Sequence, residues 1–184
     1  MKLTIKYLDN DIDIKENEVY ALEIENKNYF YRIVRDLHNI CDNNIVDDIY
    51  LSDDNNNEIN YFDKFKMFID FFDFNLNSKK ITNEIIKYVN KNISVEVKES
   101  ILNQYNKIIK LYKKELNNID IPLTIETEID SDNITKSLKI RIEAKPNLID
   151  NLLLLVDIET ILETNNMLIF VNLKQYLTRG EIEE

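Results

Sequence analysis

The first part of the chain is built from short runs of apolar residues. Residues 2–8 (KLTIKYL) show the two-residue period of a half-buried strand, and residues 19–24 (VYALEI) are a second strand-like run. Asn26 or Asn28 then stands where a helix N-cap is favoured, and apolar residues follow at intervals of three or four. We therefore predict two strands and an amphipathic helix. The apolar stripe of this helix comprises Phe30, Ile33, Val34 and Leu37.

A turn rich in Asp and Asn separates two further apolar runs. Residues 49–51 and 59–62 flank the sequence DDNNNE, which predicts a β-hairpin. The run KMFIDFF, residues 66–72, follows and has the composition of a buried strand. The chain up to this point is therefore expected to alternate between strand and helix.

Residues 75–118 follow a helical period. The pattern predicts two helices, the second longer than the first, with lysines opposite the apolar stripe. This arrangement is typical of a helical hairpin. The stripe of the first helix comprises Ile81, Ile85, Ile86 and Val89, and that of the second comprises Val97, Ile101, Tyr105, Ile108, Tyr112 and Leu116.

The last part of the chain returns to a mixed pattern. Residues 138–143 (LKIRIE) alternate as a strand does, and Pro146 stands where a first helical residue is expected, opening a helix to about Glu163. Residues 167–172 (MLIFVN) are the next strand. Two strands joined by a helix should pair in parallel with a right-handed crossover. The pattern as a whole predicts an α/β body interrupted by a helical insertion.

Residues that are scarce exclude several kinds of site. The chain of 184 residues has one glycine, Gly180, whereas phosphate loops need several positions without a Cβ. Its one histidine and one cysteine are too few for a zinc site of the usual ligand count. We interpret His38 as a helix-end residue and Cys41 as a small half-buried apolar residue. The longest aliphatic run, 152–156, is far too short to cross a bilayer, so we expect a cytoplasmic protein.

Charge is distributed unevenly along the chain. The net charge is -11, which by itself disfavours nucleic acid as a partner. The segment 78–115, however, contains nine lysines and four glutamates, so it carries +5 and the remainder carries -16. A basic module is thus embedded in an acidic body. On charge alone the plainer interpretation, that the lysines solvate helix faces, stays open.

The reactive groups that remain are carboxylates. Glu126, Glu128, Asp130 and Asp132 are spaced by two, so an extended chain with a turn after Asp130 would gather them around a hard cation such as calcium. A solvated strand edge, with Asp132 capping the next turn, explains the same spacing. A two-metal nuclease or phosphatase is a further possibility, although no accompanying Lys or His motif points to it.

Three short motifs occur in a suggestive order. These are RIVRDLHN at 32–39, FFDFNLNS at 71–78, and the strand at 167–172 followed by LKQYLT. Together they resemble the signature segments of the CRISPR-associated Csn-two family of type II-A systems. The matching residues are Ile33, Val34 and Arg35; Phe74 and Asn75 to Ser78; and Leu168, Ile169, Phe170, Val171, Asn172, Tyr176, Leu177 and Thr178.

The resemblance implies an α/β fold with a degenerate P-loop-like head and an inserted α-helical leg domain. We place the head at 1–74 and 133–184 and the leg at 75–132. The family forms ring-shaped homotetramers that bind calcium and take up double-stranded DNA ends through a lysine-lined channel. The calcium ligands would be the four carboxylates at 126–132. The DNA-binding residues would be Lys79, Lys80, Lys87, Lys91, Lys107, Lys110 and Lys114.

The leading hypothesis is therefore a non-enzymatic DNA-binding protein acting in CRISPR spacer acquisition, a step of antiviral defence. Other CRISPR adaptation proteins and the effector nuclease would be further partners. The alternatives are a metal-dependent nuclease using the Glu126–Asp132 carboxylates and an acidic protein-interaction module. Family members continue beyond Tyr-Leu-Thr with another helix and strand, so we expect the second part of the head to be incomplete at Glu184, with an open sheet edge.

Overall fold

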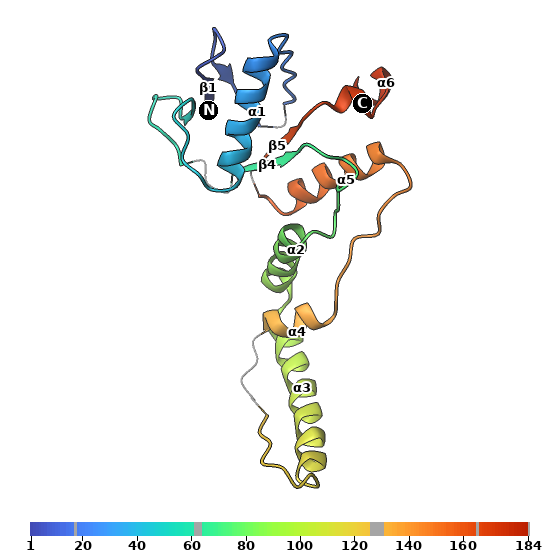
Figure 1. Ribbon diagram of the computed structural model, residues 1–184. Helices are drawn as coiled ribbons and strands as arrows, with labels where there is room; N and C mark the ends of the chain where they lie inside the picture. Colours follow the sequence, from blue (N-terminus) through green and yellow to red (C-terminus); the bar gives the residue numbers. More distant parts are fainter. Residues whose placement is uncertain (17, 61–63, 126–130, 165, 184) are drawn as a thin grey trace. The chain divides into compact units, whose positions relative to one another are not determined.

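The chain is a mixed α/β protein that divides into two compact units. The computed structural model describes residues 1–16, 18–60, 64–125, 131–164 and 166–183 (Figure 1). Unit 1 comprises residues 1–74 and 163–184, and unit 2 comprises residues 75–162. The boundary after residue 74 coincides with the one expected from the sequence. The second boundary lies further along the chain, because residues 133–162 belong to the same unit as 75–132.

A small antiparallel sheet opens unit 1. Strand β1 (Lys2–Ile5) pairs on one side with β2 (Ile12–Asp13) and on the other with β3 (Ile49–Ser52). Leu3 pairs with Leu51 across the sheet, and both side chains are buried. The alternation of apolar and polar residues in β1 therefore places one face of this sheet in the core, as predicted.

Helix α1 (Lys27–Cys41) packs its apolar stripe into the same core. Asn26 is the N-cap, and its side-chain oxygen accepts hydrogen bonds from the backbone N–H groups of Asn28 and Tyr29. This confirms the predicted helix and selects Asn26 from the two expected caps. The buried cluster of unit 1 comprises Leu3, Ile5, Ile33, Leu37, Ile40, Ile49, Leu51 and Phe65.

The predicted hairpin after β3 forms in part. The segment from Asp53 to Asn57 makes the turn, with the Asp53 carboxylate accepting from the backbone N–H groups of Asn55 and Asn57. The chain returns through a single antiparallel bridge between Ser52 and Glu58. Residues 61–63 lie outside the described residues.

A parallel pair of strands completes unit 1. Strand β4 (Phe65–Phe68) pairs with β5 (Met167–Phe170), so that segments about 100 positions apart in the sequence lie side by side (Figure 1). These strands confirm the first part of each predicted run, 66–72 and 167–172, whereas residues 69–72 are not part of a strand. In a nucleotide-binding sheet a glycine-rich loop would follow. Here β5 is followed by Asn172, at a left-handed φ of 59°, and by the 3-10 turn η1 (Leu173–Gln175).

The residues around the end of β5 are packing and capping residues. Phe170 stacks on Phe68 with ring centroids 5.4 Å apart, and Tyr176 lies 5.0 Å from Phe71. Thr178 and Glu181 then form a capping box at the start of α6 (Arg179–Glu183), in which the Glu181 carboxylate accepts from the Thr178 N–H at 2.7 Å. The motif Tyr-Leu-Thr therefore has a structural role here.

The strand predicted at residues 19–24 is wrong. The segment has no regular secondary structure, and Val19 is 97% exposed. The reason is that β1 already pairs with β2 on one edge and β3 on the other, so the sheet offers this run no place beside β1. A strand-like composition does not form a strand without a neighbour.

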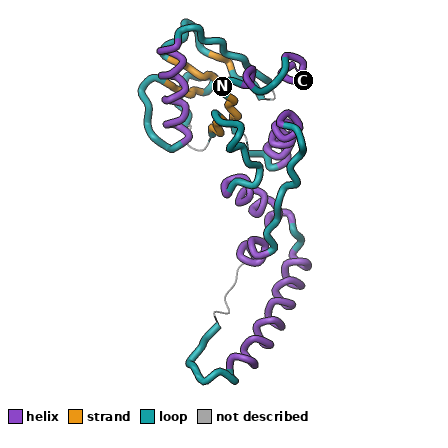
Figure 2. Tube along the Cα trace, turned by 45° about the vertical axis from the view of Figure 1, so that its right-hand side comes forward, coloured by secondary structure: helices purple, strands orange, loops and turns teal. Residues whose placement is uncertain are grey.

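Unit 2 is helical. Helix α2 (Lys79–Asn92) begins at the cap Ser78, and α3 (Val95–Leu116) begins at the cap Ser94, which confirms both predicted helices. Helix α4 (Ser131–Ser137) packs against α2, and buried Thr135 donates a hydrogen bond to buried Asn90 at 2.6 Å. Helix α3 does not fold back along α2 as a hairpin would; it runs on away from it (Figures 1 and 2). The partner of α2 is α4 instead.

The predicted βαβ unit is also wrong in its first strand. Residues 140–145 have no regular secondary structure, and β5 pairs with β4. The predicted helix is present as α5 (Leu148–Ile161), but its N-cap is Asn147, so Pro146 precedes the cap and does not occupy the first helical position. No helix within the described ranges is long and apolar enough to span a bilayer.

Candidate nucleic-acid interface

Four of the seven candidate DNA-binding lysines lie on α2. Lys79, Lys80, Lys87 and Lys91 are all exposed. Lys80, Lys87 and Lys91 are separated by seven and four positions, so the helical period places them on one side of α2. Three side-chain ammonium groups therefore follow one line along the helix.

The other three lysines lie on α3. Lys107, Lys110 and Lys114 are exposed and are separated by three and four positions, so they share one face of the helix. The helical period puts this face opposite the apolar stripe, as the sequence predicted. The described structure thus brings the lysines together in two groups, one on each of two consecutive helices.

These lysines have no carboxylate partner in the part of the chain that the structure describes. Three lysines of unit 1 behave differently. Lys6 pairs with Asp48 at 2.8 Å, Lys15 pairs with Glu18 at 3.4 Å, and Lys174 pairs with Glu23. Because an ammonium already neutralised by a carboxylate attracts phosphate less strongly, the cations of unit 2 are better suited to bind a polyanion.

Sequence reasoning missed a further pair of cations that belongs to this candidate interface. Lys139 and Arg141 lie in the segment between α4 and α5, and both are exposed. Lys136 on α4 and Lys145 are exposed neighbours in the same stretch and are not assigned to the interface. The alternation of residues 138–143 predicted a strand, and the charge of its polar positions was not used. The useful signal was the charge, since three cations occur there within seven residues.

The four predicted calcium ligands cannot be placed together. Glu126, Glu128 and Asp130 lie outside the described residues, and of Asp132 only the backbone is described, in the first turn of α4. The described residues contain no other group of three or more His, Cys, Asp or Glu side chains arranged to hold a metal ion. The calcium assignment therefore stays a prediction.

His38 and Cys41 occupy the positions expected of them. His38 lies in the last turn of α1, and its Nδ1 is 3.3 Å from the Asp42 carboxylate. Cys41 ends the same helix and is half-buried against the core of unit 1. The two side chains thus have contacts that account for them within α1 and the adjoining core.

A sequence model of one protein family matches residues 41–184, which is more than half of the chain. The description of this family is CRISPR-associated protein (Cas_Csn2). The chain belongs to the Cas_Csn2 family. The match confirms the predicted family and covers two of the three motifs, the segment 71–78 and the strand β5 with its Tyr-Leu-Thr. It also covers all seven candidate lysines. A search of curated proteins found no match.

Proposed function

We propose that this Cas_Csn2 protein binds double-stranded DNA without catalysing a reaction on it, as a step of CRISPR spacer acquisition. Binding would be independent of sequence, because ammonium groups on helix faces contact phosphates and read no base edges. Within this proposal unit 1 corresponds to a P-loop-like head that has lost its phosphate loop, and unit 2 corresponds to the helical leg.

The observation that carries the proposal is the set of seven exposed lysines on α2 and α3. Six of them, all but Lys79, lie in two lines, one on each helix. The seven have no carboxylate partner among the described residues, and they belong to a chain whose net charge is -11. The segment 78–115 concentrates nine lysines in an otherwise acidic chain. A polyanionic partner gives the grouping a physical reason.

We further propose that the protein acts as a ring-shaped homotetramer. Support comes from the apolar stripe of α3, because three of its residues are strongly exposed in the single chain. Val97 and Ile108 are each 49% exposed, and Tyr112 is 62% exposed. Apolar side chains that face water are unfavourable. Contact with further copies of the chain would bury them and so stabilise the assembly.

Calcium is the proposed cofactor. Glu126, Glu128, Asp130 and Asp132 supply the hard oxygen donors that calcium prefers, so the chemistry of this donor set fits the ion. A bound divalent cation would offset the negative charge of these carboxylates. The carboxylates themselves would repel phosphate when no cation is present.

The test is binding of the full chain to a labelled linear duplex, with calcium and at several salt concentrations. We expect binding at low salt that weakens steeply as salt rises and that is the same for duplexes of unrelated sequence. Absence of binding at low salt with calcium present would contradict the proposal. Indifference to DNA together with a stable complex with another protein would favour the acidic interaction module.

A parallel reaction separates binding from catalysis. The same duplex is incubated with magnesium or manganese, and we expect it to stay intact. Cleavage that is lost on replacing Asp130 and Asp132 with alanine would favour the nuclease. Light scattering with and without calcium then reports the oligomeric state, for which we expect a tetramer when calcium is bound; a monomer under both conditions would contradict the ring.

A further inference from the structure

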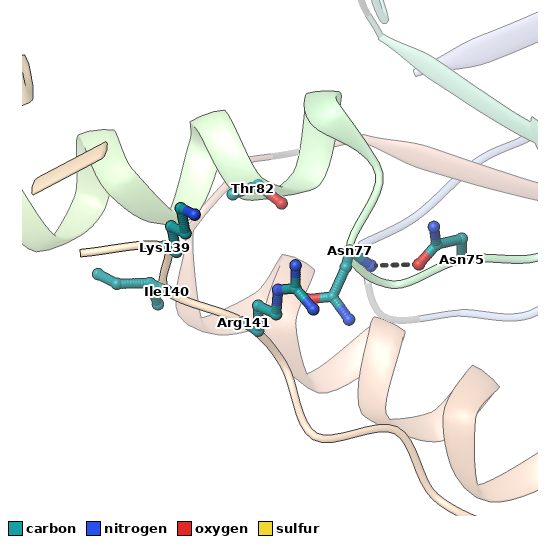
Figure 3. A pocket seen from close by; sticks show the side chains of 6 residues that line it. All are labelled: Asn75, Asn77, Thr82, Lys139, Ile140 and Arg141. Carbon is teal, nitrogen blue, oxygen red and sulfur yellow. Dashed lines mark hydrogen bonds between the residues drawn. The ribbon is translucent and has the colours of Figure 1, made fainter. Parts of the chain in front are cut away.

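A cationic cavity lies beside the beginning of α2. Its volume is about 470 Å³, and Figure 3 shows that its lining comes from two segments far apart in the sequence. One is the entry to α2, and the other is the extended segment that follows α4. The lining residues are Asn75, Asn77, Thr82, Lys139, Ile140 and Arg141.

Two hydrogen bonds hold these segments together. The Asn77 side-chain Nδ2 donates to the Ile142 carbonyl at 3.0 Å, and the Ile142 N–H donates to Asn77 Oδ1 at 2.7 Å. The Asn77 side-chain amide thus satisfies both the N–H and the carbonyl of Ile142, as a neighbouring strand would. It fixes the segment that carries Arg141 against the N-terminal end of α2.

The backbone at Lys139 directs the chain into this position. Its φ is 52°, in the left-handed region that non-glycine residues seldom adopt, and its N–H donates to the Lys136 carbonyl at the end of α4. In Figure 3 the Lys139 side chain points toward α2, and the Arg141 guanidinium lies beside Asn77. The Ile140 side chain, between them, extends in the direction away from Asn77.

The lining contains two cationic side chains and three polar ones besides Ile140, and it contains no carboxylate. Lys139 and Arg141 have no ion-pair partner in the part of the chain that the structure describes. Over the same part, the Thr82 hydroxyl and the Asn75 amide nitrogen make no hydrogen bond. An ammonium, a guanidinium, a hydroxyl and an amide that line one cavity suit an anion with several oxygen atoms.

We propose that this cavity binds a phosphate group, with Arg141 as its main ligand through two parallel N–H donors and Lys139 as a second charge. The inference rests on the proposed function in one respect, since it takes DNA to be the source of the phosphate. DNA offers two kinds of phosphate group: the phosphodiesters of the duplex backbone and the phosphomonoester at a 5′ end. The terminal group carries more negative charge and projects freely, so a concave site can surround it.

The test uses the double variant Lys139→Gln with Arg141→Gln and a matched control. The control is Lys136→Gln with Lys145→Gln, which removes the same charge from the same stretch without touching the lining of the cavity. Both changes are at exposed residues, and far-UV circular dichroism checks that both variants fold. Each protein is titrated with a 5′-phosphorylated linear duplex, a 5′-hydroxyl linear duplex and a closed circular duplex.

The outcomes distinguish the two sources. If the terminal phosphate occupies the cavity, wild type and control prefer the phosphorylated duplex and the cavity variant loses that preference. If backbone phosphates occupy it, the cavity variant binds all three duplexes more weakly, and its slope of log affinity against log salt falls by about 1.8 for two lost contacts. Equal behaviour of the cavity variant and the control in every titration would overturn the proposal.

A second arm separates this inference from the proposed function. Thermal unfolding is followed in inorganic phosphate and in chloride at equal ionic strength. We expect phosphate to raise the Tm of wild type and control but not of the cavity variant. If none of the three proteins binds any duplex, the proposed function fails, and the phosphate titration alone decides whether the cavity is a phosphate site. The site is overturned if phosphate raises the Tm of all three proteins equally, or raises the Tm of none of them.

Discussion

The Asn77 side chain pairs with the backbone of Ile142 across 65 positions of sequence, through hydrogen bonds of 3.0 Å and 2.7 Å. Both the donor and the acceptor of the amide are used, as in a pair of residues in a β-ladder. The Asn77 N–H in turn donates to Asn75 Oδ1 at 2.8 Å, just before the Ser78 cap of α2. One side chain therefore links the start of α2 to the segment between α4 and α5.

Replacing Asn77 with alanine should destabilise the protein. The change leaves the backbone N–H and carbonyl of Ile142 without their partner, and such a loss costs about 1–3 kcal/mol for partly buried groups. Urea unfolding followed by circular dichroism measures it. The matched control is Asn118→Ala, an exposed position after α3, for which we expect a change within about 0.5 kcal/mol. Equal effects of the two substitutions would show that the Asn77 pairing contributes no stability.

Helices could be predicted from the sequence because each depends mainly on residues within its own segment. The apolar stripe of α1 and the helical periods of α2 and α3 are encoded within a few positions, and these three helices were predicted correctly, with the cap of α1 narrowed to Asn26 or Asn28. The caps of α2 and α3, Ser78 and Ser94, were not predicted. Strands are different because each needs a neighbour. Residues 19–24 and 138–143 have strand-like composition, yet β1 pairs elsewhere and Asn77 supplies the second run with its hydrogen bonds.

The same limit applies to the candidate interface. The seven lysines follow from helical periodicity, so their exposure on α2 and α3 could be predicted. Lys139 and Arg141 could not be linked to Thr82 in this way, because the cavity depends on a contact between segments about 60 positions apart. That contact rests on the Asn77 amide, and no pattern of apolar residues signals it.

Exposure at Val19 predicts a large difference between two apolar substitutions in unit 1. Val19 is 97% exposed, whereas Leu51 in β3 is 1% exposed. We expect Val19→Ala to change the free energy of unfolding by less than about 0.5 kcal/mol, and Leu51→Ala to lower it by about 2–5 kcal/mol. Chemical denaturation of the two variants compares them directly. A large loss at Val19 would mean that residues 19–24 are packed after all.

Asp48 should make stability depend on pH in the acid range. The hydrogen bond from Lys6, and then that from Tyr7, lower the pKa of Asp48 from its ordinary value of 3.8. A carboxyl with a lowered pKa in the folded state stabilises the fold above about pH 3.8, and this contribution is lost as the pH falls through the folded pKa. Thermal unfolding between pH 2 and 6 should therefore be less pH-dependent in Asp48→Asn. Asp9→Asn, at an exposed position, is the control because it removes the same charge without touching Lys6 or Tyr7.

Removing the lysines of α3 should lower the salt dependence of DNA binding. In the triple variant with Lys107, Lys110 and Lys114 replaced by glutamine, three phosphate contacts are lost, and the slope of log affinity against log salt should fall by about 2.7. In the control, Lys6, Lys15 and Lys174, which already pair with carboxylates in unit 1, are replaced by glutamine. It changes the net charge by the same amount, so a purely global effect of charge would weaken both variants equally. A slope that falls only in the α3 variant identifies the helix face as the contact, and equal slopes would place the duplex elsewhere on the protein.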